Sequence, residues 1–583
     1  MFLAPAPNRE ITPALIESGL TAILFAAAFV FPRLGCSCFS RIERVMAKLA
    51  RRKGPAVVMV GLGAFLLRLA ILPVCPIPLP FSPDDFSFQL AADTFAHGRL
   101  SNPTPAMWTH FETIHVTMQP TYMSMYFPAQ GLLLAAGKVL FGHPWYGLLI
   151  ASALMCASIC WMLQAWLPAT WALLGGIIAV VHLGLFSYWV NTYHAAGSIG
   201  AIGGALVLGA LPRLIRTSRF RYGILLAVGI ILIAGTRPYE GVLLCLPVAV
   251  MLGHWIFVGK NRPSTRVLIR RMVFPLALIA AAGAWMGYYD YRAFGSPLTL
   301  PYTVDRATYA IAPYFVWQSP RPEPKYRHEA MRSFYHVGEL DFFSGIHTPS
   351  GFLPNTLLKV WLGLIFFTGS ALLPPLIMLR RTLLDRRIRF LVLCVLVLIA
   401  GMVIQIYLIP HYLAPFTAVF YALGLQAMRH LRLWKPEGKP VGATIARLMV
   451  TLCFLMVGMR LYAGPLHLAL PEWPASNWNF NWYGPDHFGT ERARIEKNLD
   501  QLPGKHLVLV RYSTMHNPFE EWVYNAADID GAKVAWAREM DPSADLELMR
   551  YYKDRSVWLV QPDALPATLT PYPGVEQPVA AGQ

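Results

Sequence analysis

The sequence predicts an α-helical protein that crosses a membrane about twelve times and ends in a small soluble α/β domain. Of its 583 residues, 55% are hydrophobic and only 14% are charged, whereas soluble domains average roughly 25% charged residues. Several apolar runs reach or approach the ~20 residues that a helix needs to cross the hydrocarbon core of a bilayer. After residue 463 the composition changes, and short apolar segments alternate with polar ones.

The apolar runs define the predicted spans. One further run, PAQGLLLAAGKVLFG at 128–142, is too short to cross a bilayer, so we predict an interfacial or re-entrant helix there. The predicted spans lie near residues 14–32, 55–74, 145–164, 170–188, 195–213, 220–236, 239–258, 272–289, 355–379, 390–409, 411–429 and 443–462.

The formal net charge of +17 comes largely from the connections between these spans. With twelve spans, the most basic connections all fall on one side, which the positive-inside rule identifies as cytoplasmic. Counting 128–142 as a span would reverse every later connection. Cytoplasmic loops therefore explain the positive charge, and no binding to nucleic acid is expected. The basic connections are 33–54, 213–221, 260–271, 380–389 and 429–439.

This topology divides the chain into three predicted regions. Residues 1–54 hold the first span and a basic cytoplasmic connection, and 55–462 form the multi-span body, with outer loops at 75–144 and 290–354. Residues 463–583 form a domain outside the cytoplasm. In the first region the basic residues follow the apolar run, unlike those of a signal peptide, so the first span is expected to stay in the inner (plasma) membrane.

The C-terminal region reads as alternating strands and helices. KHLVLVRY (505–512), KVAWARE (533–539) and SVWLVQ (556–561) are typical of buried strands, and 518–527 and 543–553 fit helices. This order predicts a small α/β unit with a parallel sheet. The region carries no glycine-rich phosphate motif and no nucleophile elbow, so we expect a scaffold or a domain that docks the acceptor.

The most informative segment is FSPDDFSFQLAADTFAHGRL, which begins the long outer loop. After Pro83 it predicts a short amphipathic helix with Asp84 and Asp85 in the first turn, where the helix dipole favours carboxylates. Either acid could therefore be a helix cap. Two adjacent acids at a bilayer surface are costly without a task, however, which favours a functional role. The expected membrane-facing residues of this helix are Phe86, Leu90 and Phe95.

Two sets of charged residues lie where predicted spans leave the membrane. Arg68 lies near the outer end of its span, either as a snorkelling side chain or as a buried cation that pairs with an acid or a phosphate. In TRPYEG (236–241), Arg237 and Glu240 are either a local ion pair or the lining of a cavity.

Further polar and aromatic residues belong to the same outer face. PHYLAP (410–415) places His411 and Tyr412 between two spans, where a histidine can be structural or functional. The tyrosine-rich stretch 288–310 contains Arg292 and Arg306. Such a surface suits stacking on sugars and holding a phosphate, although an ordinary loop can share its composition.

These features together resemble a known superfamily. An Arg late in a span (RLAILP), followed by PDDFSFQLAADTFAHGRLSNP and by MYFPAQGLLLAAGKVLFGHPWYG, is similar to the GT-C glycosyltransferases, in the branch of protein O-mannosyltransferases and aminoarabinose transferases. The resemblance covers roughly 55–260 and, more loosely, the body to 462. The second acid is Asp85 where the family often has Glu. Met125, Tyr126 and Phe127 replace the family's charged residue before a double Pro.

The resemblance implies an integral-membrane enzyme that takes a sugar from a polyprenyl-phosphate donor and works on the outer face. It implies that Asp84 is the general base and that Asp85 belongs to the same catalytic pair. The acceptor could be a glycan, a lipid or a protein. Transfer from a lipid phosphate to a hydroxyl needs a base and cations that stabilise the departing phosphate. The candidate donor- and phosphate-binding residues are Arg68, Arg237, Glu240, Arg292, Arg306, His411 and Tyr412.

No cofactor is required by the sequence. Asp93, His97 and Glu112 are candidate ligands for a divalent cation near the acidic pair, but their spacing does not demand one. Three other functions stay open: a transporter or flippase of a lipid-linked sugar, a polymerase or ligase of surface glycan, and a non-catalytic envelope assembly protein. A transporter would spread its polar groups through the bilayer midplane and would favour inverted repeats, whereas here they gather at one face.

Overall fold

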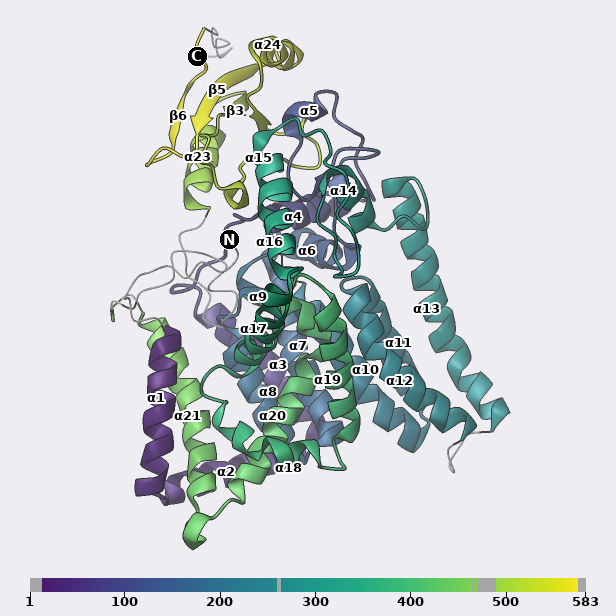
Figure 1. Cartoon of the computed structure of the whole chain (residues 1–583), viewed down its shortest axis with the longest axis vertical. Helices are drawn as coiled ribbons and strands as arrows, with labels where there is room; N and C mark the ends of the chain where they lie inside the picture. Colours follow the sequence, from purple (N-terminus) through teal and green to yellow (C-terminus); the bar gives the residue numbers. More distant parts are fainter. Residues whose placement is uncertain are drawn as a thin grey trace.

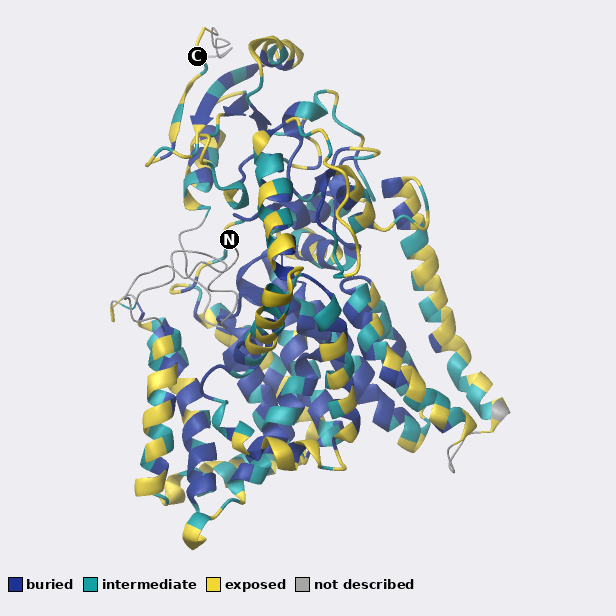
Figure 2. Cartoon of the chain, viewed as in Figure 1, coloured by how far each residue is buried: buried dark blue, intermediate teal, exposed yellow. Residues whose placement is uncertain are grey.

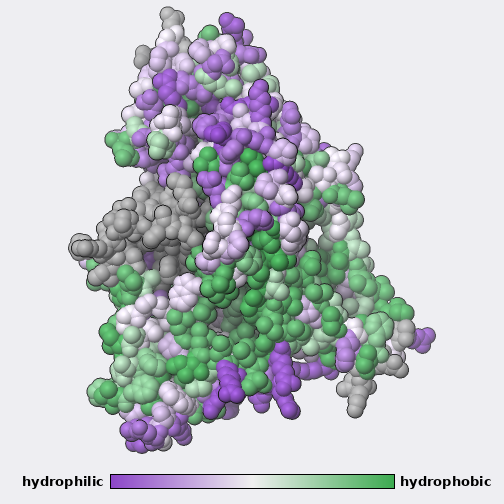
Figure 3. Space-filling model, in the orientation of Figure 1, coloured by the Kyte–Doolittle hydropathy of each residue, from purple (hydrophilic) through white to green (hydrophobic). Residues whose placement is uncertain are grey.

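The computed structural model describes residues 13–194, 196–258, 264–463, 465–466, 468 and 489–574. It shows a helical bundle with a layer of short helices and loops at one end and a small α/β unit above that layer (Figure 1). Hydrophobic side chains form a broad band around the bundle, while hydrophilic ones cover the α/β unit and the opposite edge of the bundle (Figure 3). This distribution is that of a multi-pass membrane protein, and the predicted fold class is confirmed.

Eight helices are long and apolar enough to span a bilayer in the part of the chain that is described. Three of the remaining predicted spans are shorter apolar helices, α8 with its π-helical extension η1, α11 and α19. The last begins as the 3₁₀ turn η4 (Pro410–Phe416) and continues as α20 (Thr417–Arg432). The eight long helices are α1 (Pro13–Val30), α3 (Lys53–Ala70), α7 (Trp145–Trp166), α10 (Gly197–Thr217), α12 (Pro238–Phe257), α13 (Thr265–Phe294), α17 (Pro349–Thr368) and α21 (Val441–Leu461); the shorter ones are α8 (Ala169–Ala179), η1 (Val180–Gly184), α11 (Phe220–Ala234) and α19 (Arg389–Ile404).

The core of the bundle lies between α3, α7, α8, α10 and α20, whose facing residues are buried (Figure 2). Glycine lets two of these elements approach closely: a Cβ on Gly204 of α10 would clash with the carbonyl oxygen of Pro415 in η4. By contrast α13 packs mainly against α11 and stays exposed along most of its length. An apolar helix that is exposed in this way faces lipid.

The run at 128–142 forms α6 (Pro128–Phe141), a helix of 14 residues. At 1.5 Å per residue it is about 21 Å long, too short to cross the hydrocarbon core. It packs against α4 (Pro83–Ala96) in the layer above the bundle (Figure 1), where Gly131 leaves room for Ala91. The same layer contains α5 (Trp108–Phe111), the short hairpin β1 (Val116–Thr117) and β2 (Met123–Ser124), α14 (Pro301–Tyr309), α15 (Glu329–Arg332), the π-helix η2 (Ser333–Glu339) and α16 (Leu340–Ile346).

The C-terminal unit is a four-stranded sheet in the order β4-β3-β5-β6. Strands β3 (Lys505–Val510), β4 (Val534–Arg538) and β5 (Arg555–Gln561) are parallel, as the sequence predicts, and the edge strand β6 (Thr568–Pro571) is antiparallel. The predicted helix at 543–553 is α24 (Pro542–Tyr551), and an unpredicted helix, α23 (Thr490–Gln501), precedes the sheet.

The predicted helix at 518–527 is wrong. Only the 3₁₀ turn η6 (Pro518–Glu520) forms there, and the chain then runs without regular structure through Trp522, Val523 and Tyr524, all of them buried. This stretch is apolar because it packs on both sides, between the sheet and the outer loop of the membrane body. A run that is buried on more than one side cannot be distinguished from a helix by its composition.

Candidate active site

Helix α4 presents the acidic pair in two different environments. Its N-terminus is a capping box: Ser82 Oγ accepts from the Asp85 backbone N–H at 3.2 Å, and the Asp85 carboxylate accepts from the Ser82 N–H at 3.3 Å. Pro83 occupies the first helical turn, where its missing N–H costs nothing. The helix cap that the sequence left open is therefore Asp85, and Asp84 is not needed for it.

Asp85 is completely buried, and both of its carboxylate oxygens are engaged. Besides the cap, Oδ1 accepts from the backbone N–H of Tyr193 at 2.8 Å and lies 3.2 Å from Nδ1 of His194. These contacts fix the start of α4 to the turn before α10, which includes residues far away in the sequence. Asp85 thus positions the site, because its oxygens are not open to a substrate.

Asp84 points the other way and stays partly accessible, with 23% of its side chain exposed. Its Oδ1 lies 2.8 Å from Nδ1 of His115 and also accepts a hydrogen bond from the Tyr126 hydroxyl. Tyr126 is held by stacking on Phe88, at 4.3 Å between ring centroids. A carboxylate, an imidazole and a phenol therefore meet at one point of the outer layer.

The sequence analysis missed His115. Its backbone has φ of 63°, in the left-handed region that residues other than glycine rarely adopt. The carbonyl of His115 accepts from Ser87 Oγ at 2.7 Å and from the Met125 N–H at 3.2 Å, so the strained turn is held from two sides. Outliers of this kind concentrate at functional sites. A lone histidine in a loop gives no spacing signal, which is why the sequence did not point to it.

The electrostatics of the pair follow from its surroundings. Burial alone raises the pKa of the Asp84 carboxyl, but the hydrogen bond and charge of His115, together with the charges of His194 and Arg237, outweigh burial and lower it. For His115, burial opposes the charged form, while Asp84 and the more distant Asp305 raise the pKa above its usual value. The two groups stabilise each other as an ion pair.

A second carboxylate stands behind His115. The Tyr335 hydroxyl lies 3.2 Å from Asp305 and 3.4 Å from the backbone N–H of His115. Burial raises the pKa of the Asp305 carboxyl to about 6, although the charges of His115 and Arg306 oppose the rise. Arg306 itself donates to both oxygens of Glu339 at 2.7 Å. This predicted phosphate ligand is thus already paired inside the outer loop.

Arg237 is the cation that remains available near Asp84. It is 9% exposed, and among the described residues none is hydrogen-bonded to its Nε. Its guanidinium lies over the ring of Tyr412, at 4.3 Å from the centroid. Its charge acts on Asp84 and also on Glu240, which is buried in the first turn of α12. A buried cation beside the exposed carboxylate is suited to an anionic ligand.

His411 lies close to Arg237 but has a partner of its own. Its Nδ1 lies 2.8 Å from the Tyr188 hydroxyl, and its ring packs edge-on against those of Tyr412 and His194. The predicted residues Arg237, Glu240, His411 and Tyr412 therefore come together, as the sequence suggested. Two turns between helices, α11–α12 and α19–α20, supply them.

Arg68 and Arg292 lie elsewhere. Arg68 is completely buried and donates to Asn191 Oδ1 at 2.8 Å and to the carbonyl oxygens of Cys75 and Pro76. It ties the outer end of α3 to the segment before α10 and contacts neither aspartate through a hydrogen bond. Arg292 is exposed on α13, where its side chain donates to the Tyr288 hydroxyl at 3.0 Å.

Phe86 and Leu90 of α4 do not face the membrane, contrary to expectation. They pack into a core that they share with the C-terminal unit, and Phe86 stacks on Tyr524 at 4.5 Å. Phe95 packs instead against Tyr289 of α13. The apolar face of α4 is explained by a domain interface, which a sequence pattern cannot distinguish from a membrane surface.

The C-terminal unit also holds the turn that carries His115. The Tyr524 hydroxyl donates to the carbonyl oxygen of Ile114 at 3.1 Å, and Arg538 Nε donates to that of Glu112 at 2.8 Å. Ile114 is fully buried. Residues on either side of the strained position are therefore fixed by side chains more than 400 positions away.

Replacing Tyr524 with Phe keeps the stack on Phe86 and removes only the hydrogen bond to Ile114. We expect faster amide hydrogen exchange in the peptide around 110–117 and a fall in turnover of roughly five-fold, the effect of one hydrogen bond of about 1 kcal/mol. Hydrogen exchange followed by mass spectrometry measures the first. Tyr551→Phe is the matched control, because the Tyr551 hydroxyl bonds Asp530 on the surface of the same unit. Equal exchange in both variants would show that the bond does not hold the turn.

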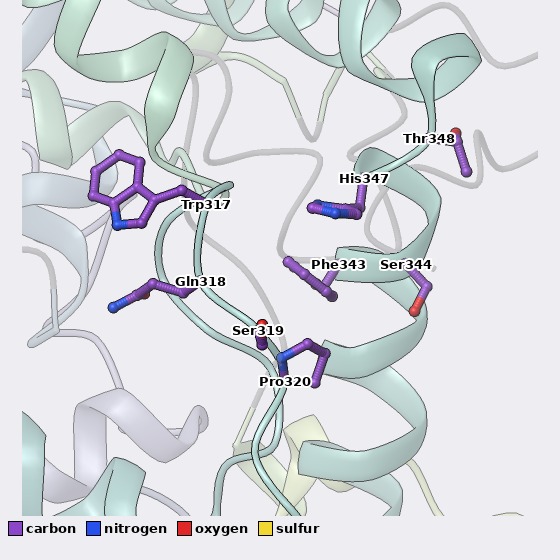
Figure 4. A pocket seen from close by; sticks show the side chains of 8 residues that line it. All are labelled: Trp317, Gln318, Ser319, Pro320, Phe343, Ser344, His347 and Thr348. Carbon is purple, nitrogen blue, oxygen red and sulfur yellow. The ribbon is translucent and has the colours of Figure 1, made fainter.

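A separate pocket of about 370 Å³ lies between the loop 317–320 and α16 (Figure 4). None of its lining residues is charged, so it carries no acid or base for transfer chemistry. The lining consists of Trp317, Gln318, Ser319, Pro320, Phe343, Ser344, His347 and Thr348.

The described residues do not offer a metal site. No three His, Cys, Asp or Glu side chains within them are grouped as ligands. Asp93, one of the predicted candidates, instead accepts from Lys138 Nζ and from the Ala527 N–H at 2.8 Å. A divalent cation therefore stays a prediction without a ligand set, and the chemistry below is derived without it.

Comparisons with known proteins were made for the sequence and for the structure. No protein-family model and no curated protein matches the sequence. Three solved structures are similar to this chain. They are the Archaeoglobus fulgidus oligosaccharyltransferase AglB with an inhibitory peptide and a dolichol-phosphate (11% identity, 86% of this chain and 69% of that chain, TM-score 0.46), the same organism's oligosaccharyltransferase with Zn and sulfate (11%, 86% and 67%, 0.44), and ArnT from Cupriavidus metallidurans bound to undecaprenyl phosphate (11%, 87% and 92%, 0.43). Oligosaccharyltransferase and ArnT are GT-C glycosyltransferases, the superfamily that the sequence resembles.

Proposed function

We propose that this chain is a membrane glycosyltransferase that moves a sugar from a polyprenyl-phosphate donor to an acceptor on the outer, periplasmic face. The observation that carries the proposal is the position of Asp84. It is a partly exposed carboxylate bound to His115, beside the buried cation Arg237, in the layer where the spanning helices end. A base and an unpaired cation are the two groups that such a transfer requires.

In the proposed reaction, Asp84 and His115 act on the acceptor hydroxyl. Its oxygen attacks C1 of the sugar, the bond between C1 and the donor phosphate oxygen breaks, and polyprenyl phosphate leaves with the electron pair. The hydroxyl proton passes to the Asp84–His115 pair. Asp84 alone is a weak base because its pKa is lowered, whereas the pKa of His115 is raised. The pair therefore holds the proton more readily than the carboxylate alone.

Arg237 stabilises the departing phosphate in this proposal. Tyr412 supports its guanidinium from one side, and Glu240 and His411 complete the wall of the site. Asp85, Arg68 and Arg306 position the backbone through the contacts described above, and Arg292 is given no part in the reaction. The donor's prenyl tail stays in the bilayer, which explains why the site lies at the ends of spanning helices.

The proposed placement follows the charge pattern. The connections 33–54, 213–221, 380–389 and 429–439 face the cytoplasm of a cell whose inner membrane holds the chain. Region 55–462 is then the catalytic body, and 463–583, of which 489–574 are described beyond the junction, lies outside the cytoplasm. The acceptor is a glycan, a lipid or a protein that reaches this face.

Purified protein incubated with a panel of polyprenyl-phosphate sugars and an outer-face acceptor extract tests the proposal. Mass spectrometry would follow both the loss of intact donor and the appearance of polyprenyl phosphate. We expect one donor to be consumed with an equal yield of polyprenyl phosphate. Movement of intact donor across proteoliposomes without cleavage would instead identify a transporter, and neither result would favour a non-catalytic assembly protein.

The pH dependence of turnover tests the role of the pair. Because His115 must be neutral to accept a proton, turnover is expected to rise with pH through an apparent pKa above 6.5, the ordinary value that Asp84 and Asp305 raise. His115→Gln should remove this limb and lower turnover. A wild-type profile that is flat between about pH 5 and pH 8 would contradict the role of His115.

A further inference from the structure

Helix α2 (Cys36–Arg51) connects the ends of two spanning helices on the side opposite the Asp84 site. It follows α1 and leads directly into α3, and it lies across the lower ends of α1 and α21 (Figure 1). A helix of 16 residues is about 24 Å long. Since it joins two spans at one boundary of the hydrophobic band, it runs along the membrane surface.

One face of α2 is fixed to the bundle. Glu43 accepts from Arg432 at 2.7 Å and from Arg447 at 3.0 Å, and the guanidinium of Arg447 lies over Phe39. Ala50 is fully buried in the main core. Burial acts to raise the pKa of Glu43, but the two arginines outweigh it and lower the pKa to about 2. The orientation of α2 about its own axis is therefore set at every physiological pH.

The remaining circumference of α2 is exposed and divides into two strips. Cys38, Ile42 and Val45 follow one another at helical spacing, and Ile42 and Val45 are 51% and 57% exposed. Beside this apolar strip runs a basic strip without any acid, made of Arg41, Arg44, Lys48 and Arg51, all exposed. A helix with adjacent apolar and basic strips is suited to the boundary between acyl chains and headgroups.

We propose that α2 is an interfacial binding site for anionic phospholipids of the leaflet on this side of the membrane. The apolar strip enters the acyl region, and the basic strip binds headgroup phosphates. Charge complementarity supports this occupant, because four exposed cations gather without an acid. The neighbouring surface supports it too: α3 exposes Val58, Leu62 and Leu66, so protein does not cover this side of the bundle. The proposal is independent of the proposed transferase activity.

Lipid selectivity is the first readout. The full-length protein, purified in detergent, is offered equal amounts of phosphatidylglycerol and phosphatidylcholine, and retained lipids are counted by native mass spectrometry. A variant with Arg41, Arg44, Lys48 and Arg51 changed to Gln is expected to lose about ten-fold of its preference for phosphatidylglycerol. The matched control changes Arg380, Arg381, Arg386 and Arg387 to Gln, which removes the same charge from exposed residues on the same side. Equal preference in the wild type and both variants would overturn the proposal.

The depth of Cys38 is the second readout and identifies the occupant. Cys36→Ser and Cys245→Ser leave Cys38 as the exposed thiol for a nitroxide label, because the other cysteines are buried. In vesicles with about one third phosphatidylglycerol, we expect the label to be accessible to oxygen and protected from a water-soluble nickel complex. Accessibility to nickel would place the strip in water, and protection from both reagents would mean that a second protein covers it. Either result would overturn the proposal.

Discussion

Asp84→Asn is expected to abolish sugar transfer while leaving donor binding intact. The substitution keeps the shape of the side chain and can still bond Tyr126, but it removes the charge that holds His115 and raises its pKa. Loss of a positioned base lowers turnover by about 10² to 10⁴. Turnover is measured as polyprenyl phosphate formed per enzyme, and donor binding as the dissociation constant at equilibrium.

Two further variants separate this role from a general loss of structure. Asp341→Asn removes an exposed carboxylate from the same outer loop and should keep wild-type turnover. Asp84→Glu keeps the charge but moves it by one methylene, so a partial recovery of turnover is expected. An Asp84→Asn protein with wild-type turnover would return this acid to a structural role.

Arg237→Ala is expected to weaken use of the donor more strongly than Asp84→Asn does. The guanidinium is buried and has an unpaired Nε, so a donor phosphate is the anion that it can bind. Removing a preorganised cation costs about 10² to 10³ in turnover, and here the dissociation constant of the donor should also rise. Titration with polyprenyl phosphate, the common product of all such donors, measures that binding without knowledge of the sugar.

The controls follow from the chemistry of the guanidinium. Arg237→Lys keeps the charge without the planar fork and should recover part of the binding. Arg321→Ala removes an exposed arginine of the outer loop and should leave the dissociation constant unchanged. Equal donor binding in wild type, Arg237→Ala and Asp84→Asn would contradict the assignment of Arg237 to the phosphate.

The sequence alone predicted the features that depend on local patterns. Apolar runs located the spanning helices, and the charge of the connections identified α6 as too short to cross. The start of α4 was readable because Ser82, Pro83 and the acids are helix-start signals. The strands at 505, 534 and 555 were readable because buried strands form short apolar runs.

Features that depend on distant contacts could not be predicted. Whether Asp84 or Asp85 caps α4 is decided by Tyr193 and His194, more than 100 residues away. His115 becomes a partner of Asp84 through a left-handed turn that no residue type announces. For the same reason the segment 518–527 was misread as a helix, and α4 was assigned to the membrane when it packs on Tyr524.

A single comparison of wild type with Asp84→Asn tests the central claim most directly. Each protein is loaded with the one donor that the wild type consumes, and mass spectrometry follows bound donor and released polyprenyl phosphate in the same sample. The account predicts that both proteins bind the donor and that only the wild type releases polyprenyl phosphate. Release at the wild-type rate from Asp84→Asn would contradict it.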